Sequence, residues 1–302
     1  MKTTLDKKET AMASTPDTTT NPYPFKSETG RQAILDRYDV LLRQWPTPLK
    51  RYTLETTYQT HVLEWGNSEG EPLVLIHGST SNSLTWMGDA ATYGTHHHVF
   101  AFDIPGDCGH SAPARLPLTG DAYSAWLQDV LEHIPALTGI PVRLLGLSLG
   151  GWISLQFAVR HPEKVGQLGL LCPAGIGPQK ASLLARILWY SLFGDKGTRR
   201  LIRDISGDDV NIPEEAVAYT MLLSKHFQPI MDPIPLLTDE ELGRLIMPVK
   251  LIAGGRDVMM HSRKSIERLT NCAPQAQCLF LPNAPHALVN QAPDMVAFFQ
   301  ET

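Results

Sequence analysis

The fold is decided by the stretch Val142-Arg143-Leu144-Leu145-Gly146-Leu147-Ser148-Leu149-Gly150-Gly151. A short apolar run meets the pattern Gly-x-Ser-x-Gly, and apolar residues at helical spacing follow until Pro162. This order predicts a buried strand, a sharp turn and a helix. A serine at such a turn is held in a strained backbone conformation that lifts its hydroxyl clear of the sheet. Ser148 is therefore a candidate nucleophile, and a glycine-rich turn with an incidental serine is the alternative.

The sequence on either side predicts an α/β fold: a mostly parallel sheet with helices on both faces. Uninterrupted apolar runs, typical of strands buried on both faces, alternate with segments of helical spacing. Such strands are predicted at residues 72–76, 98–102, 142–147, 167–172, 249–253 and 278–281. Two earlier strands, 51–57 and 60–65, are expected around a tight turn, and a helix is expected over residues 27–45.

One block between two core strands interrupts this alternation and predicts a helical cap. It shows helical spacing, and Thr238 with Glu241 forms a capping-box pattern. Both ends of the block adjoin core strands, which places it at the sheet edge where open parallel sheets bind ligands. A separate interaction module is the alternative. The predicted division is a mobile tail (1–24), an α/β core (25–172 and 248–302) and the cap (173–247).

Composition and charge favour a small-molecule substrate. The chain has 302 residues, of which 43% are hydrophobic and 19% charged, and a net charge of -5 without a long basic block. Nucleic acids and membrane surfaces are bound by clustered Lys and Arg, so neither partner is expected. No apolar run approaches the ~18 residues of a membrane span, and the N-terminus lacks the apolar core of a secretion signal. A cytoplasmic protein is expected, and its oligomeric state is left open.

Neither a metal nor another cofactor is expected. The four cysteines lack the CxxC spacing of a zinc site and do not form a recognisable disulfide framework; they are Cys108, Cys172, Cys272 and Cys278. The triplet His96-His97-His98 cannot face one ion from a strand, because successive side chains of a strand alternate. It is interpreted as a loop that enters a strand.

Two later loops supply the groups that a serine nucleophile needs. A serine hydroxyl requires a base within hydrogen-bond reach and a third group that orients the base. Asp257 and His286 each follow a predicted strand. The order Ser148, Asp257, His286 is the order found after a Gly-x-Ser-x-Gly elbow. Taken singly, Asp257 could instead form a surface ion pair with Arg256, and His286 could be a solvated loop residue.

Together these motifs resemble the α/β-hydrolase family. The matching segments are Leu75-Ile76-His77-Gly78-Ser79, Phe102-Asp103-Ile104-Pro105-Gly106, Gly146-Leu147-Ser148-Leu149-Gly150, Gly255-Arg256-Asp257 and Pro285-His286. The first helix, the loop after residue 102 and the short cap are similar to those of bacterial single-domain carboxylesterases. The resemblance implies Ser148 as nucleophile, His286 as general base and then acid, Asp257 as the group that orients His286, and the amides of Ser79 and Leu149 as the oxyanion hole.

The resemblance also implies where a substrate would lie. In the family, the position of His77 shapes the oxyanion loop, an interpretation favoured here over a role as the base. Apolar cap positions are expected to divide between packing on the core and walling a pocket. The possible pocket residues are His77, Gly78, Trp152, Leu188 and Met221, with packing as the alternative for Trp152.

Hydrolysis of small, short-chain carboxylic esters is the leading functional hypothesis. Ser148 would attack the carbonyl, two amides would hold the oxyanion, and water would release the acyl group from an acyl-enzyme intermediate. Short chains are favoured because methylenes that find no pocket under a small cap forfeit their burial. Two alternatives stay open: carbon–carbon bond cleavage in ring-fission diketones by the same triad, and a non-enzymatic small-molecule receptor with a retained triad.

Overall fold

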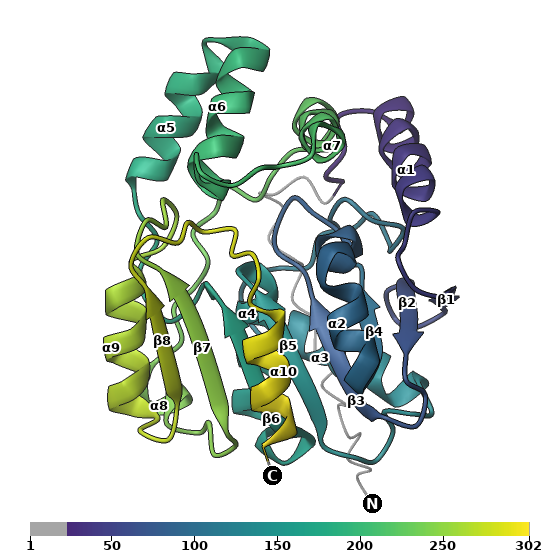
Figure 1. Ribbon diagram of the computed structural model, residues 1–302, viewed down its shortest axis with the longest axis vertical. Helices are drawn as coiled ribbons and strands as arrows, with labels where there is room; N and C mark the ends of the chain where they lie inside the picture. The colour runs from purple at the N-terminus through teal and green to yellow at the C-terminus, as the bar shows by residue number, and fades with distance from the viewer. Residues whose placement is uncertain (1–22, 302) are drawn as a thin grey trace, which may run out of the picture.

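A single eight-stranded sheet forms the centre of the protein, whose computed structural model describes residues 23–301 (Figure 1). Its strand order is β1-β2-β4-β3-β5-β6-β7-β8. β2 is antiparallel to both of its neighbours, and all the other pairs are parallel. The strands are β1 (Leu49–Leu54), β2 (Thr60–Gly66), β3 (Glu71–Ile76), β4 (His97–Phe102), β5 (Val142–Leu147), β6 (Val165–Leu171), β7 (Val249–Gly254) and β8 (Gln277–Leu281).

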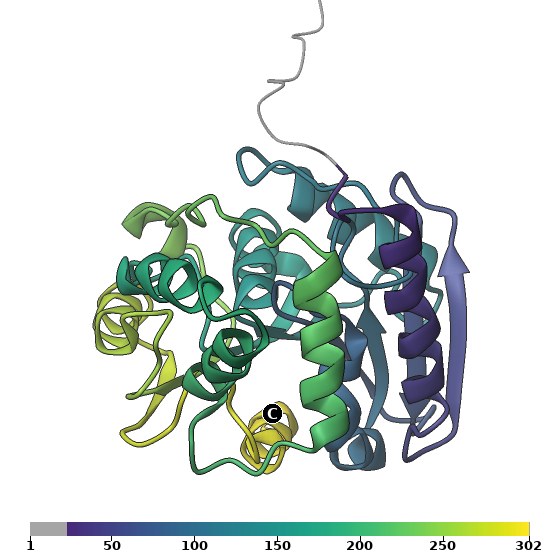
Figure 2. The same cartoon turned by 90° about the horizontal axis from the view of Figure 1, so that it is seen from above.

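Helices cover both faces of this sheet, which confirms the predicted fold class. Figure 2 shows α2 and α10 on one side and α3 and α4 on the other, and each side has its own apolar cluster. Within residues 23–301, no helix is long and apolar enough to cross a membrane. The α-helices are α1 (Glu28–Leu42), α2 (Ala90–His96), α3 (Ala122–His133), α4 (Leu149–Arg160), α5 (Ser182–Ser191), α6 (Gly194–Ser206), α7 (Glu214–His226), α8 (Asp239–Leu242), α9 (Ser262–Cys272) and α10 (Ala292–Gln300).

The first helix is shorter than its sequence pattern predicts. The Ser27 side chain caps α1 by accepting a hydrogen bond from the Gly30 amide, and the helix ends at Leu42, before Trp45 and Pro46. The apolar pattern continues past the last helical turn because Trp45 still packs into the core. Of the tail predicted over residues 1–24, residues 1–22 lie outside the described part of the chain.

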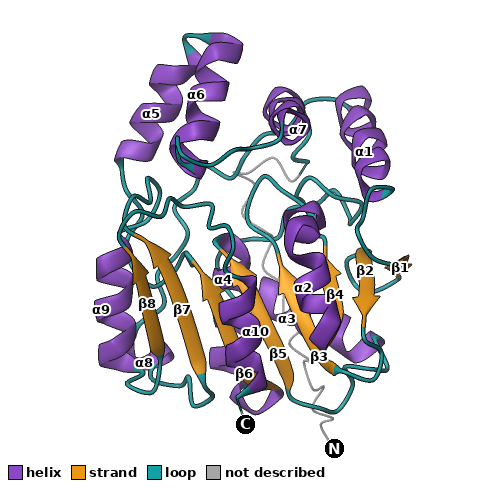
Figure 3. Cartoon of the chain, viewed as in Figure 1, coloured by secondary structure: helices purple, strands orange, loops and turns teal. Residues whose placement is uncertain are grey.

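The segment predicted as a cap contains four helices, of which α5, α6 and α7 lie above the carboxyl ends of the strands, whereas the short α8 lies at the opposite edge beside α9 (Figure 1). Helices α5 and α6 form a hairpin that projects away from the sheet, while α7 lies beside α1 (Figures 1 and 3). α8 begins with the predicted capping box, in which Thr238 and Glu241 satisfy each other's backbone amides. The hairpin and α7 therefore reach over the same edge of the sheet from two sides.

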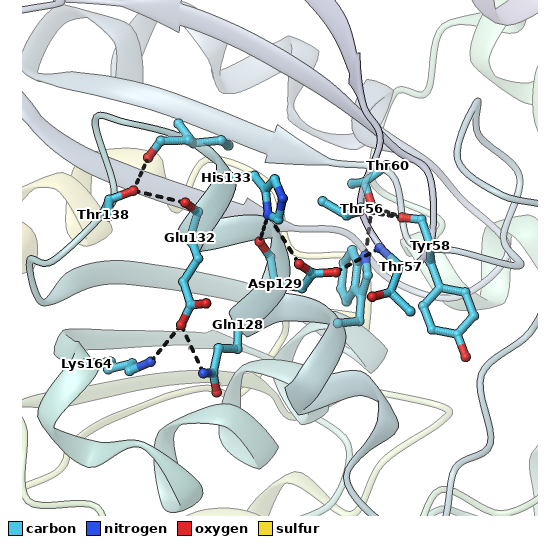
Figure 4. A network of polar contacts seen from close by, with 12 residues as sticks. Thr56, Thr57, Tyr58, Thr60, Gln128, Asp129, Glu132, His133, Thr138 and Lys164 are labelled. Atoms are coloured by element: carbon cyan, nitrogen blue, oxygen red, sulfur yellow. Dashed lines mark hydrogen bonds and ion pairs between the residues drawn. The ribbon is translucent and has the colours of Figure 1, made fainter.

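Helix α3 fastens the first two strands to the body of the protein. The Asp129 carboxylate accepts a hydrogen bond of 2.8 Å from the amide of Thr57 in the turn between β1 and β2 (Figure 4). The buried Trp126 indole donates to the hydroxyl of Thr60, at 2.9 Å. On the exposed side of α3, Lys164 pairs with Glu132 at 3.2 Å. The contacts to Thr57 and Thr60 fix the antiparallel end of the sheet, away from the candidate site at β5, β7 and β8.

Candidate active site

Ser148 occupies the turn between β5 and α4 in an unusual backbone conformation. Its φ of 52° and ψ of -109° lie in the left-handed half of conformational space that side chains disfavour. The flanking glycines make the turn possible, because a Cβ at Gly146 would overlap the Gly150 carbonyl and one at Gly150 would overlap the Ile76 carbonyl. The Ser148 amide donates to the Leu171 carbonyl at 2.9 Å, which aligns this turn with the end of β6.

Asp257 and His286 meet beyond the ends of β7 and β8. His286 Nδ1 and Asp257 Oδ2 lie 2.8 Å apart, and both side chains are buried. The second oxygen of Asp257 accepts hydrogen bonds from the amides of Met259 (2.6 Å) and Met260 (2.8 Å). Burial by itself raises the pKa of Asp257, but the His286 hydrogen bond and charge together with these two amides outweigh burial and hold the pKa below its ordinary value.

This pair fixes which nitrogen of His286 is available for proton transfer. An ionised carboxylate only accepts hydrogen bonds, so the proton lies on Nδ1 and the lone pair on Nε2. Cys172, the residue after β6, has its sulfur within 4.8 Å of both the imidazole and the carboxylate. Because β5 and β6 end in register at Leu147 and Leu171, Ser148 and Cys172 emerge at the same edge. The structure thus brings all three candidate residues to the carboxyl end of the sheet.

The backbone amides proposed from the resemblance lie beside this serine. A Cβ placed on Gly78 would lie 3.5 Å from the Ser148 Cβ, so the loop that continues into Ser79 passes directly alongside. Leu149 is the first residue of α4, and the first amides of a helix have no acceptor within the helix. The positive end of the α4 dipole also points toward this edge.

His77 has neither ring nitrogen free to act as a base. Its Nε2 accepts a hydrogen bond of 2.9 Å from the Ile104 amide, so Nδ1 carries the proton and donates to the Gly78 carbonyl at 2.7 Å. The ring is completely buried. His77 therefore ties the loop after β3 to the loop after β4, and it does not wall an open pocket.

Asp107 is a residue of this site that the sequence patterns did not single out. Its carboxylate accepts hydrogen bonds from the amides of Thr80 (3.1 Å), Ser81 (3.2 Å) and Cys108 (2.9 Å). Burial raises its pKa to about 6. Asp107 thus holds the segment that follows Ser79. The sequence shows an acidic residue in the loop after β4, but it does not show which backbone amides that residue contacts.

The three remaining pocket candidates lie in different surroundings. Trp152 is buried against Tyr123, and its indole donates to the Pro235 carbonyl at 3.0 Å, so it packs the core under the cap. Met221 is half-buried on α7. Leu188 differs from the expectation, because its side chain on α5 is 68% exposed and faces solvent rather than an enclosed pocket.

The base of the α5–α6 hairpin is fastened to the two loops that carry Asp257 and His286. Lys180 Nζ donates to the Asp257 carbonyl oxygen at 2.5 Å, and the Ala287 amide donates to the Ile205 carbonyl at 3.0 Å. A third link joins Arg256 to Asp209 at 2.5 Å. The candidate residues are thus held from above by the cap as well as from below by the sheet.

One group of three potential metal ligands exists among the described residues, and it coincides with this site. It comprises Cys172, Asp257 and His286. Burial raises the pKa of Cys172, and a protonated thiol is a poor ligand. Asp257 and His286 are already bonded to each other. This chemistry favours a neutral thiol packed beside the pair.

A serine on a strand–helix turn, with a His–Asp pair at the same edge of a mostly parallel sheet, is the arrangement that defines α/β-hydrolases. The sequence profile of the alpha/beta hydrolase family matches residues 73–297, and the chain belongs to this family. Over 269 residues it is 28% identical to Carboxylesterase YbfK of Bacillus subtilis, an alignment that covers 86% of this chain and 89% of the relative.

Two solved structures from Bacillus subtilis share the architecture. The crystal structure of naproxen esterase (carboxylesterase NP) is similar with a TM-score of 0.76 and 27% identity, covering 90% of this chain and 96% of that one. The crystal structure of a putative hydrolase gives a TM-score of 0.78 and 26% identity, covering 89% of this chain and 97% of that one. The similarity therefore extends over both the sheet and the segment between β6 and β7.

Proposed function

We propose that this protein is a cofactor-independent serine carboxylesterase that hydrolyses small, short-chain esters in the cytoplasm. The observation that carries the proposal is the buried hydrogen bond between His286 and Asp257 at the edge where the strained Ser148 turn emerges. The similarity of this chain to bacterial carboxylesterases over most of its length supports ester hydrolysis as the reaction.

In the proposed first half-reaction, Ser148 Oγ attacks the ester carbonyl while His286 Nε2 takes the hydroxyl proton. Asp257 keeps the imidazole oriented and stabilises the imidazolium that forms. The carbonyl oxygen becomes an oxyanion, which the amides of Ser79 and Leu149 stabilise. Collapse of the tetrahedral intermediate breaks the bond to the alcohol oxygen, and the imidazolium returns its proton to that oxygen. The alcohol leaves, and the acyl group stays bound to the serine.

The second half-reaction repeats these steps with water. His286 Nε2 takes a proton from water, the resulting hydroxide attacks the acyl carbon, and the same two amides hold the new oxyanion. Collapse breaks the bond to Ser148 Oγ, which regains its proton from the imidazolium. The net products are one carboxylic acid and one alcohol. Asp107 contributes by holding the Thr80 and Ser81 amides, and with them the loop that bears Ser79.

A substrate panel with a covalent label tests this proposal. We expect pure protein to hydrolyse p-nitrophenyl esters from acetyl to hexanoyl faster than longer ones, and a fluorophosphonate to label one site, Ser148. The Ser148→Ala variant is the matched control and should take no label. Cleavage of a ring-fission diketone with a higher kcat/KM than any ester would replace the proposal by carbon–carbon hydrolysis. Tight ligand binding with negligible turnover would replace it by a receptor.

A further inference from the structure

The loop that bears Ser79 ends at Asn82, a buried asparagine that reaches the cap. Its Nδ2 donates two hydrogen bonds, one to the Cys108 carbonyl at 2.8 Å and one to the Tyr219 hydroxyl at 2.7 Å. Its Oδ1 accepts from the Leu84 amide at 3.1 Å. Both hydrogens of the side-chain amide are thus in use. Because Tyr219 belongs to α7, this asparagine joins the loop after β3 to a helix of the cap.

The segment between Ser79 and Asn82 has a strained backbone. Thr80 has a φ of 57°, in the left-handed region that β-branched side chains strongly disfavour. Such a conformation persists only where the surrounding contacts impose it. Asp107 bonds to the amides of Thr80 and Ser81, and Asn82 fixes the end of the segment. Loss of either anchor would let the strained residue relax and rotate the neighbouring Ser79 amide.

Helix α7 is itself held in place, because the segment before α1 clasps its carboxyl end. Lys26 Nζ donates to the carbonyls of Ser224 and Lys225, both at 3.1 Å. A positive charge at this end also complements the helix dipole. The rings of Phe25 and Phe227 meet edge to face, with centroids 5.4 Å apart. Figures 1 and 2 show α1 lying beside α7. The buried tyrosine of α7 is therefore presented to the loop from a fixed support.

We propose that Tyr219 is a positioning residue: through Asn82 it sets the direction of the Ser79 amide, so that helix α7 controls the oxyanion hole. This inference rests on the proposed function, since the amide has a task only if an oxyanion forms. The two parts of the cap then serve different groups. The α5–α6 hairpin holds the loops of Asp257 and His286, whereas α7 holds the loop of Ser79.

Removal of one hydroxyl tests the proposal. In Tyr219→Phe the ring remains and only the bond to Asn82 is lost. We expect kcat on p-nitrophenyl acetate to fall about fivefold, less than the ~10² lost with an oxyanion donor itself, while KM stays within about twofold. The control is Tyr190→Phe, which removes a hydroxyl bonded to Asp204 at 2.9 Å between the two hairpin helices. It should keep the parental kcat.

A transition-state analogue separates positioning from a general loss of stability. Ser148 Oγ adds to the carbonyl carbon of a trifluoromethyl ketone, its proton passes to His286 Nε2, and the carbonyl oxygen becomes an oxyanion like that of the proposed intermediate. The inhibition constant should rise about fivefold in Tyr219→Phe, in parallel with the fall in kcat, and stay unchanged in Tyr190→Phe. A Tyr219→Phe variant that melts at a lower temperature but keeps the parental kcat and inhibition constant would overturn the proposal.

Amide hydrogen exchange tests the link between α7 and the loop without a substrate. We expect peptides covering residues 77–84 to exchange about tenfold faster in Tyr219→Phe than in the parent or in Tyr190→Phe, because a lost anchor permits local opening. Unchanged exchange would overturn the proposal. If the parent neither hydrolyses esters nor takes a fluorophosphonate at Ser148, the proposed function fails. Faster exchange would then still support the positioning of this loop by α7.

Discussion

The candidate active site and the exposed apolar end of the α5–α6 hairpin are built on opposite principles. This second region, called the hairpin patch here, comprises Leu188, Trp189, Leu192 and Phe193. At the sheet edge, Ser148, Asp257 and His286 come from distant parts of the chain, are buried, and are held by hydrogen bonds from several elements. At the hairpin, Trp189 and Phe193 come from adjacent turns and lie exposed. Fixed geometry is what catalysis by a triad requires, whereas exposed apolar area suits contact with a surface. Substitutions in one region should therefore leave the property of the other unchanged.

The largest effect is expected from Ser148→Ala. Loss of the proposed nucleophile should lower kcat by about 10⁶-fold, as in other serine hydrolases of the triad type, because no other group can take its place. Steady-state kinetics on a short-chain p-nitrophenyl ester measure the loss. Residual activity within tenfold of the parent would refute the nucleophile assignment.

Asp257→Asn should have the next largest effect, a loss of about 10⁴-fold in kcat. The amide no longer fixes the proton on His286 Nδ1, so the imidazole loses the tautomer that leaves Nε2 free. Kinetics on a short-chain p-nitrophenyl ester measure the loss. Asp294→Asn, at an exposed acid on α10, is the control and should retain parental turnover. The reverse ranking of the two variants would show that the acid has been misassigned.

Asp107→Asn should have an intermediate effect on turnover. Only one oxygen remains to accept from three amides, so the loop that bears Ser79 loosens, and kcat should fall about tenfold, less than the ~10² lost with an oxyanion donor. Exposed Asp121→Asn serves as the control. An unchanged kcat in Asp107→Asn would show that this carboxylate does not position the loop.

The same variant should change how stability depends on pH. Because burial raises the folded-state pKa of Asp107 to about 6, the folded protein holds this proton more tightly than the unfolded chain does. The contribution of Asp107 to the parent's free energy of unfolding is thus greatest below the ordinary carboxyl pKa of ~4. It falls as the pH rises through about 6. Denaturant unfolding between these pH values should show Asp107→Asn gaining stability relative to the parent as pH rises. A constant difference would contradict the raised pKa.

The smallest effect is expected from Trp189→Ala when a soluble ester is the substrate. Its ring lies at the outer end of the hairpin, away from the links at Lys180 and Ile205 that reach the loops bearing Asp257 and His286. We expect kcat/KM within about twofold of the parent, as for other exposed substitutions that break no buried contact. Kinetics on p-nitrophenyl acetate measure it. A loss above tenfold would mean that the patch takes part in binding the ester, and would weaken the contrast between the two regions.

The sheet and the candidate triad could be predicted because their signals are local. Apolar runs mark the strands, the glycines around Ser148 mark a turn that tolerates no side chains, and Asp257 and His286 each follow a strand directly. The role of Asp107 could not be predicted, because it depends on one loop meeting another. Leu188 was expected in a pocket because helical spacing shows that a face is apolar, but spacing does not show what covers that face.

The links at the base of the hairpin limit how this cap can be exchanged between proteins. Lys180, Asp209 and Ile205 each bond to a loop that carries Asp257 or His286, so a graft cut at the end of β6 and the start of β7 would remove contacts that hold the proposed catalytic groups. A graft confined to the outer turns, residues 186–203, would keep all three. The boundary at which this cap behaves as an interchangeable part therefore lies partway up the hairpin, and not at the edge of the sheet.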